Sequence, residues 1–174
     1  MSCNDKKGKF DSHCVCDVVK FINELQDAVT DTCPTGCDTP FLGANTAAPF
    51  ANTRPFVLYT KSGDLFLPSN CFKFAGDFFT ISPFLRVESV DDCCAVLRVL
   101  TPVAEDHDDD CHSRGSKHSL QEEARELICA FTNGLHNGHK TIPVNLEASN
   151  SCITVDLNCF CAIQCLRDTR VRGV

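Results

Sequence analysis

Residues 152–168, CITVDLNCFCAIQCLRD, decide the fold that the sequence predicts. Between Ile153 and Cys165 the odd-numbered positions hold only aliphatic residues and cysteines, whereas most even-numbered positions are polar. Successive side chains of a β-strand point to opposite faces, so this alternation predicts a strand with its cysteines on the apolar face. The run is long for one strand, and we therefore expect a bend or bulge near Cys161. Cys152 falls on the opposite, polar face.

The same geometry limits which cysteines can bond one another. Strand residues two apart are separated by about 6.5 Å at Cα, the far limit for a disulfide, and residues four apart by about 13 Å. Cys159, Cys161 and Cys165 therefore need partners from elsewhere, or remain small buried side chains. Cys93 and Cys94 are neighbours that point to opposite faces of a strand, so we expect at least one exposed thiol there.

Other segments predict a hairpin and a helix. β-branched residues are dense in 83–90 and 93–100, which flank an Asp-Asp turn and predict a hairpin. Apolar residues recur at helical spacing in 17–31, which predicts a helix that packs on the sheet. Residues 119–131 begin with a capping-box pattern, and predict either a helix or a strand. We expect a mainly β fold, an antiparallel β-sandwich with one N-terminal α-helix.

The chain divides into an N-terminal arm and one domain. Residues 1–16 are polar, and we expect a flexible arm there. Residues 17–174 form a single cysteine-rich β domain in this interpretation, since 174 residues suffice for one buried core. Within it, residues 101–118 are acidic, rich in histidine and almost without apolar side chains, which predicts an exposed loop.

Charge and cysteine content restrict the class of protein. The net charge is −7, and basic residues gather only near the two ends, so we expect no nucleic-acid binding. We also expect no secretory leader, and no apolar run approaches the roughly 20 residues of a membrane span. The 14 cysteines nevertheless suit an oxidising environment. This conflict favours a protein that is made in a cytosol and cross-linked later.

Enzyme and metal motifs are missing from the sequence. It contains no nucleophile elbow, zinc-protease helix, phosphate loop or dinucleotide fingerprint, so we expect no enzyme, no catalytic residue and no cofactor. It contains no C-x2-C pair, which disfavours a structural zinc site. His107, Cys111 and His112 are a weak alternative metal set, although a solvated acidic loop explains them better. The alternative function is a cysteine-rich zinc-binding module.

Three motifs make a family resemblance specific: FLGANTAAPFANTRPFVLYTKSG (41–63), FLRVESVDDCCAVLRVL (84–100) and the opening stretch. With them the chain resembles the spore coat protein Y/Z family of Bacillus-type endospores. HCVCDVVKFINELQDAV (13–29) and the following CPTGC also resemble the amino-terminal helix and cysteine pair of that family. Residues 68–80 and 103–126 do not follow the family pattern.

The resemblance implies a structural function. Such proteins are made in the mother-cell cytoplasm and deposited on the spore surface, in the outer coat, crust or exosporium. It implies self-assembly into hexameric rings and a hexagonal two-dimensional lattice cross-linked by disulfides. The implied partners are further copies of the chain and other spore coat or exosporium proteins.

The cysteines are the candidate site residues. Those within the matched motifs are Cys14, Cys33, Cys37, Cys94, Cys152, Cys159, Cys161 and Cys165. The full set of cross-linking candidates adds Cys3, Cys16, Cys93 and Cys111. The sequence does not decide which of them pair within a chain and which pair between chains.

Overall fold

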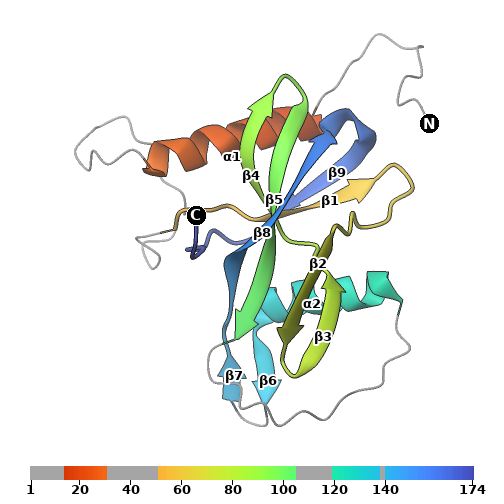
Figure 1. Ribbon diagram of the computed structural model, residues 1–174, viewed down its shortest axis with the longest axis vertical. Helices are drawn as coiled ribbons and strands as arrows, with labels where there is room; N and C mark the ends of the chain where they lie inside the picture. The colour runs from red at the N-terminus through yellow and green to blue at the C-terminus, as the bar shows by residue number, and fades with distance from the viewer. Residues whose placement is uncertain (1–13, 31–50, 105–118, 138–139) are drawn as a thin grey trace.

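The computed structural model describes residues 14–30, 51–104, 119–137 and 140–174, and shows a mainly β, antiparallel fold with two helices (Figure 1). The helices are α1 (Cys14–Thr30) and α2 (Leu120–Asn133). The strands are β1 (Phe56–Thr60), β2 (Ser69–Phe74), β3 (Asp77–Ile81), β4 (Leu85–Asp91), β5 (Cys94–Ala104), β6 (Leu135–Asn137), β7 (Lys140–Ile142), β8 (Val144–Asp156) and β9 (Phe160–Cys165). The predicted antiparallel β fold with an N-terminal helix is confirmed.

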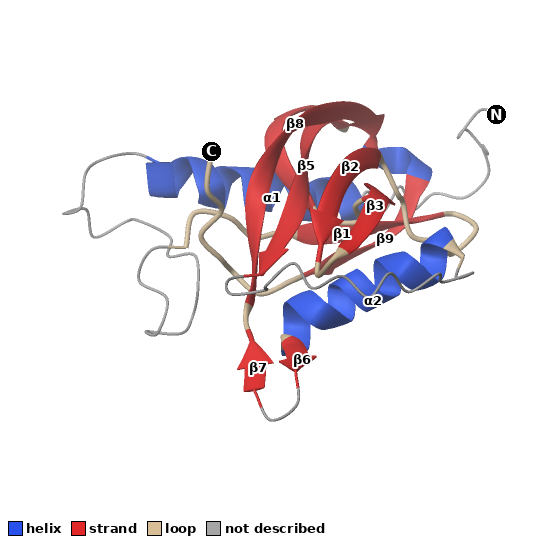
Figure 2. Cartoon of the chain, turned by 60° about the horizontal axis from the view of Figure 1, so that its bottom comes forward, coloured by secondary structure: helices blue, strands red, loops and turns tan. Residues whose placement is uncertain are grey.

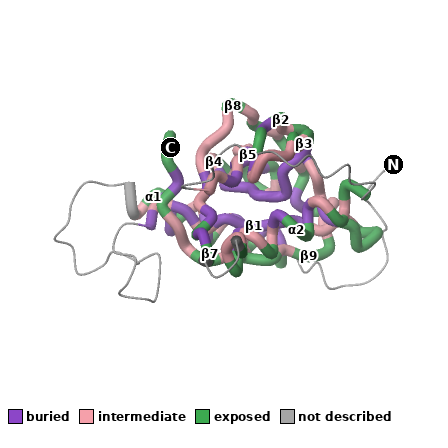
Figure 3. The backbone as a smooth tube through the Cα atoms, turned by 90° about the horizontal axis from the view of Figure 1, so that it is seen from below, coloured by how far each residue is buried: buried purple, intermediate pink, exposed green. Residues whose placement is uncertain are grey.

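The main sheet bends into two layers. Its strand order is β8-β5-β4-β1-β9, and every pairing is antiparallel. β1 and β4 are joined by a single residue pair, Phe56 with Leu85, whereas the other neighbours share longer ladders. The sheet therefore turns sharply at this pair, and β1 and β9 lie across the core from β4 and β5. Figure 3 shows the buried parts of β4 and β5 facing the buried part of β1.

Helix α1 closes one side of the core between the layers. Val15, Val19 and Ile22 recur on one face of the helix, and each is at most 4% exposed. They pack with Phe56 of β1 and with residues of β4 and β5 in one cluster. The helix begins at Cys14 and not at residue 17, so the predicted arm boundary at residue 16 is wrong. An apolar stripe that starts at Val15 needs the helix to start before it.

A second cluster lies below the first, between α2, the β2–β3 hairpin and the lower halves of β5 and β8 (Figure 2). In this cluster the ring of the fully buried Phe84 meets that of Phe131 edge to face, with 5.5 Å between the ring centroids. Aromatic pairs in this geometry contribute about 0.5–1.5 kcal/mol beyond their buried area. The cluster fixes the position of α2 against the sheet.

Residues 119–131, for which the sequence predicted either a helix or a strand, belong mainly to helix α2. Ser119 accepts from the backbone N–H of Glu122, whose carboxylate accepts from the Ser119 backbone N–H at 2.9 Å. This capping box provides hydrogen-bond acceptors for backbone N–H groups at the start of a helix, whereas in a strand these groups would donate to neighbouring strands. The expectation of one helix is corrected to two. The expected loop 101–118 is also corrected, because its first residues, 101–104, complete β5.

The opening stretch forms two strands and not one. β8 ends at Asp156, a short 3-10 turn covers Leu157–Cys159, and β9 follows. The Asp156 carboxylate accepts from the Asn158 backbone N–H at 2.9 Å and caps this turn. The predicted bulge near Cys161 is confirmed, because Tyr59 pairs with Ala162 and Thr60 with Phe160, which leaves Cys161 as the extra residue.

A disulfide joins α1 to the β4–β5 hairpin. Cys16 and Cys93 lie 5.4 Å apart at Cα and 77 residues apart in sequence. Cys16 is 1% exposed, so it does not belong to an exposed arm as predicted. The bond closes a long loop that holds α1 over the core.

Replacing Cys16 and Cys93 together by serine should lower the free energy of unfolding by about 3 kcal/mol, since a long unfolded loop is released. Urea unfolding of the soluble protein without reductant measures this loss. Cys94→Ser is the matched control, because its exposed neighbouring thiol should change stability by no more than about 0.5 kcal/mol. Equal midpoints for the double variant and the control would contradict the structural role of the bond.

A charged network links the three strands of one layer. The buried Arg86 donates from Nε to Thr53 Oγ1 at 3.1 Å, and its guanidinium lies 2.9 Å from the Glu88 carboxylate. Glu88 also accepts from Arg98 Nε at 2.7 Å, and Arg98 donates to the Ser149 carbonyl at 3.0 Å. Glu88 therefore balances two arginines that span β4, β5 and β8.

Glu88→Gln should destabilise the fold by about 1–3 kcal/mol, because Arg86 stays buried without its counter-charge. Glu147→Gln is the matched control, since its pair with Arg172 is long, at 3.6 Å, and exposed. The control should change stability by less than about 0.5 kcal/mol. Thermal unfolding compares the two, and an equal loss in both would overturn the assignment.

Candidate cross-linking site

Seven reduced cysteines are exposed on the described surface. They are Cys14, Cys71, Cys94, Cys129, Cys152, Cys161 and Cys165. Exposed thiols are accessible to oxidants and to other chains, unlike buried cysteines, which behave as small apolar side chains. These seven define the surface on which cross-linking chemistry is available.

The pair Cys93 and Cys94 shows how neighbours divide their roles. Cys93 turns inward to Cys16, whereas Cys94 begins β5 and is exposed. The expectation of an exposed thiol at this pair is confirmed. Cys159 is also disulfide-bonded. It follows the buried Leu157 in the turn between β8 and β9.

Cys94 and Cys152 share the outer face of the β5–β8 ladder. Cys94 pairs with Asp156 and Cys152 with Arg98. Cys152 and Asp156 are four residues apart on one strand, so the two cysteines are separated by about 13 Å along the ladder. This distance excludes a disulfide between them within one folded chain.

Cys161 and Cys165 lie on β9, the last strand of the sheet. They were expected on the apolar face, and Cys165 does stand opposite the buried Phe56. Both are nevertheless exposed, because an edge strand is covered less completely than a central strand. Cys161 Sγ donates to the Thr60 carbonyl at 2.9 Å. Four residues also separate these two thiols, so they do not bond each other within the strand.

An ion pair lies beside Cys165. Arg54 donates from two nitrogens to the Asp168 carboxylate at 2.7 and 2.8 Å. The pKa of the Cys165 thiol is raised chiefly by its partial burial; Arg54 opposes this rise and Asp168 adds to it. The thiolate is the nucleophile in disulfide chemistry, so a raised pKa slows reaction at this cysteine.

Two exposed cysteines were missed by sequence reasoning, Cys71 and Cys129. Cys71 precedes Phe72 and Phe74 on β2, and these phenylalanines are buried while Cys71 faces outward. Cys129 lies between the buried Leu127 and Phe131 on α2 but points to the opposite face. Strand alternation and helical periodicity were the signals that could have found them.

The remaining predicted site residues lie outside the described residues. These are Cys3, Cys33, Cys37 and Cys111, together with the alternative metal set His107, Cys111 and His112. In the part of the chain that the structure describes, no three His, Cys, Asp or Glu side chains come together as a metal site. Among the same residues, no helix is long and apolar enough to cross a membrane.

The fold and its surface thiols define a cysteine-rich β protein. The family model for spore coat protein Z matches residues 1–168. Spore coat protein Z of Bacillus subtilis (strain 168) is 33% identical over 156 residues, which cover 89% of each chain. No solved structure gives a significant match. The chain belongs to the spore coat protein Z family, which confirms the resemblance, and it is a structural protein deposited on the spore surface.

Changing either half of the ion pair should move the pKa of Cys165 in opposite directions. Arg54→Gln should raise it, because a cation that favours the thiolate is lost, and Asp168→Asn should lower it. The pH dependence of iodoacetamide alkylation, followed by mass spectrometry on the peptide that contains Cys165, measures the pKa in a background where the other six exposed cysteines of the described surface are serine.

Arg172→Gln is the control for these variants, because Arg172 pairs with Glu147 and is not among the charges that shift the pKa of Cys165. Circular dichroism of each variant checks that the fold is kept. A shift in the same direction for Arg54→Gln and Asp168→Asn would contradict the assigned charge effects.

Proposed function

We propose that this chain self-assembles into a hexagonal two-dimensional lattice on the spore surface, which disulfides between copies then lock. The lattice acts as a barrier and scaffold, and no catalytic step is involved. Its partners are further copies of the chain, in hexameric rings, and other spore coat or exosporium proteins.

The observation that carries the proposal is the number and placement of the exposed thiols. Seven reduced cysteines lie on α1, α2, β2, β5, β8 and β9, so they point in many directions. Strand geometry excludes bonds within the pairs Cys94–Cys152 and Cys161–Cys165. Thiols that cannot pair within a chain are available to pair between chains.

The order of assembly and cross-linking follows from the difference between the disulfide-bonded cysteines and the exposed, reduced ones. The Cys16–Cys93 bond stabilises the single domain, while the exposed thiols remain reduced until copies meet. Synthesis in the reducing mother-cell cytoplasm suits the reduced exposed thiols, and exposure on the spore suits their oxidation. Noncovalent contacts therefore set the lattice geometry first. Disulfides added afterward raise the barrier to unfolding and to loss of subunits.

Replacing all seven exposed cysteines by serine should leave assembly intact, but the sheets should lose their resistance to heated detergent. We expect negative-stain electron microscopy to show hexagonal sheets for both the variant and the unmodified protein. Heated detergent without reductant should disperse the variant sheets, whereas the unmodified sheets should also need reductant. The variant keeps Cys16, Cys93 and Cys159 with the disulfide bonds of these residues. It also keeps Cys3, Cys33, Cys37 and Cys111, so peptide mass spectrometry of the variant sheets must show whether any of these four joins two copies.

The control for folding is the circular dichroism spectrum and thermal transition of the seven-serine variant. A folded variant that stays monomeric while the unmodified chain forms sheets would show that disulfides are needed for assembly, and the proposed order would be wrong. Single particles for the unmodified chain itself would overturn the self-assembly proposal.

A further inference from the structure

Strand β9 has one edge that no described strand pairs. It is the terminal strand of the sheet and pairs only with β1. The Leu166 N–H donates to the Pro55 carbonyl at 2.8 Å, which makes this an inward-facing hydrogen-bonded position. Antiparallel ladders alternate, so Ala162 and Gln164 also direct their backbone toward β1. Ile163 and Cys165 direct their backbone N–H and C=O groups to the open edge.

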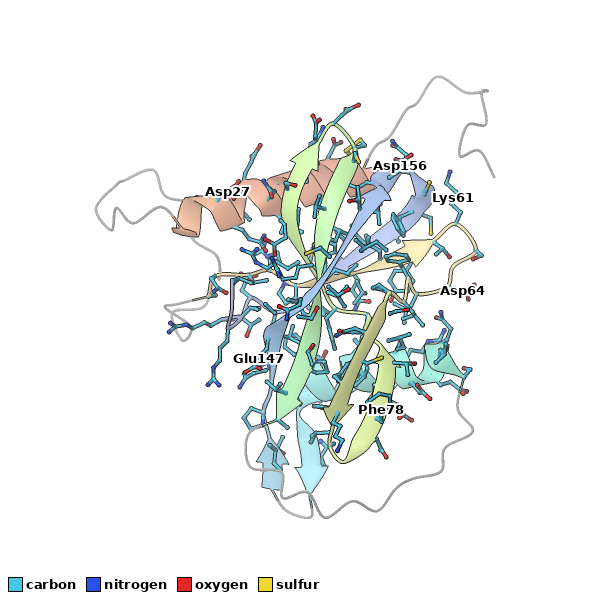
Figure 4. The ribbon with its side chains drawn as sticks, viewed as in Figure 1. Asp27, Lys61, Asp64, Phe78, Glu147 and Asp156 are labelled. Carbon is cyan, nitrogen blue, oxygen red and sulfur yellow. A yellow bond between two sulfur atoms is a disulfide. The ribbon has the colours of Figure 1, made fainter. Side chains whose placement is uncertain are left out.

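This edge lacks the usual protection of edge strands. The segment FCAIQC contains no charged residue and no proline, which are the common means of preventing edge pairing. The opposite edge of the sheet differs, because β8 carries Glu147 and Asp156 toward its two ends (Figure 4). The C-terminal segment also covers part of β8, where the Ala148 N–H donates to the Arg172 carbonyl at 2.9 Å. Of the two edges of the five-stranded sheet, β9 is thus the one open to another strand.

We propose that β9 pairs antiparallel with β9 of a second copy across a twofold axis at Ile163. The inference rests on the proposed self-assembly and identifies one of its contacts. A self-pairing strand must match outward residues with outward residues, so the axis passes through one residue and not between two. An axis at Ile163 or at Ala162 lets the two β9 strands overlap over nearly their full length. Only the axis at Ile163 places Cys161 opposite Cys165 of the second copy, and it does so twice.

The two opposed cysteines are in range of a disulfide. Directly opposed residues in a regular hydrogen-bonded antiparallel pair lie about 5.5 Å apart at Cα, within the commonest range for disulfides. Cys161 is the extra residue of the β9 bulge, so its spacing from Cys165 of the second copy departs from this value by the local distortion of the bulge. Both side chains are exposed. The new bond replaces the hydrogen bond from Cys161 Sγ to the Thr60 carbonyl. The contact therefore supplies both a noncovalent step and a covalent lock.

The oxidant is a low-molecular-weight disulfide such as oxidised glutathione. One cysteine thiolate attacks it, which forms a mixed disulfide and releases one glutathione thiolate. The thiolate of the opposed cysteine then attacks the cysteine sulfur of the mixed disulfide, which forms the interchain bond and releases the second glutathione as a thiolate. The two protons lost by the cysteines go to the two glutathione thiolates, so two thiols are oxidised and one small disulfide is reduced.

A twofold contact has a defined place in a hexagonal sheet. Rings form through head-to-tail contacts between unlike surfaces, whereas an isologous contact pairs one surface with itself. The β9 contact is isologous, so it joins one ring to the next. Its loss should leave isolated rings and not single chains.

Complementation of two serine variants tests the register. In a background where the other five exposed cysteines are serine, one chain carries Cys161→Ser and the second carries Cys165→Ser. With oxidised glutathione, an equal mixture should give a covalent dimer, and peptide mass spectrometry should identify the bond between Cys161 and Cys165. Each variant alone should not give a dimer through Cys161 or Cys165, because like cysteines stand about 13 Å apart across the axis. Homogeneous cross-linking as strong as that of the mixture would overturn the register.

Charges on the exposed face test the pairing without cysteine. The register places Ala162 opposite Gln164 of the second copy. Ala162→Lys with Gln164→Lys should break sheets into isolated rings, because like charges oppose each other. Ala162→Lys with Gln164→Glu should restore sheets, since each lysine then meets a glutamate. Both changes are at exposed positions, so folding should survive.

The outcomes separate this inference from the proposed function. If the unmodified chain forms sheets and both charge variants do too, self-assembly stands and the β9 contact is overturned. If both charge variants lose sheets, the register is wrong. If the unmodified chain remains as single particles and the mixed serine variants give no dimer, both proposals are overturned.

Discussion

The pairing of Phe56 with Leu85 is the constraint on which the rest of the structure depends. Both side chains are fully buried, and this is the one ladder contact between the two layers of the main sheet. A longer ladder would keep β1 flat beside β4 and leave α1 without a closed core to cover. Because the sheet turns here, a domain of modest size encloses its apolar side chains between two layers. The same turn leaves β9 and β8 as open ends of one sheet.

Helix α1 depends on that turn and secures it. Its side chain Gln26 is buried and donates to the Val87 carbonyl at 2.9 Å, while its oxygen accepts from the Arg54 backbone N–H at 3.4 Å. One amide thus bridges β4 and the segment that leads into β1. Together with the Cys16–Cys93 bond, it ties the helix to the layers at two separate points. A buried amide without such partners would destabilise the core, so the bridge is specific to this arrangement.

Local patterns in the sequence predicted the elements well, and tertiary features less well. The alternation at 153–157 and the hairpin around residues 91 and 92 follow from side-chain period and turn residues. The break at Leu157–Cys159 was not predicted, because an apolar residue at 157 fits both a continuous strand and a buried turn. The helix begins at Cys14, earlier than the predicted residue 17, because its apolar stripe begins at Val15.

The cysteines show why a face assignment alone does not determine exposure. Cys16 appeared polar in context and is buried, because it lies on the same helix face as Val19. Cys165 was assigned to the apolar face and stands opposite Phe56, yet it is exposed. The side-chain period identifies the face of the strand or helix on which a residue lies. Only the strand order shows whether another layer covers that face. Strand order here depends on the turn at Phe56 and Leu85, which no local pattern encodes.

The closed core and the proposed assembly therefore both depend on the bend in the main sheet. A closed barrel would have buried its edges and would have left no strand for a neighbour to pair with. A flat sheet of five strands would have had edges but a core open on both faces. The bent sheet keeps a closed core and two edges, of which β8 carries charge and a covering segment while β9 carries neither. The cysteines follow this division: the bond of Cys16 and Cys93 secures the core, and the thiols of β9 lie on the open strand.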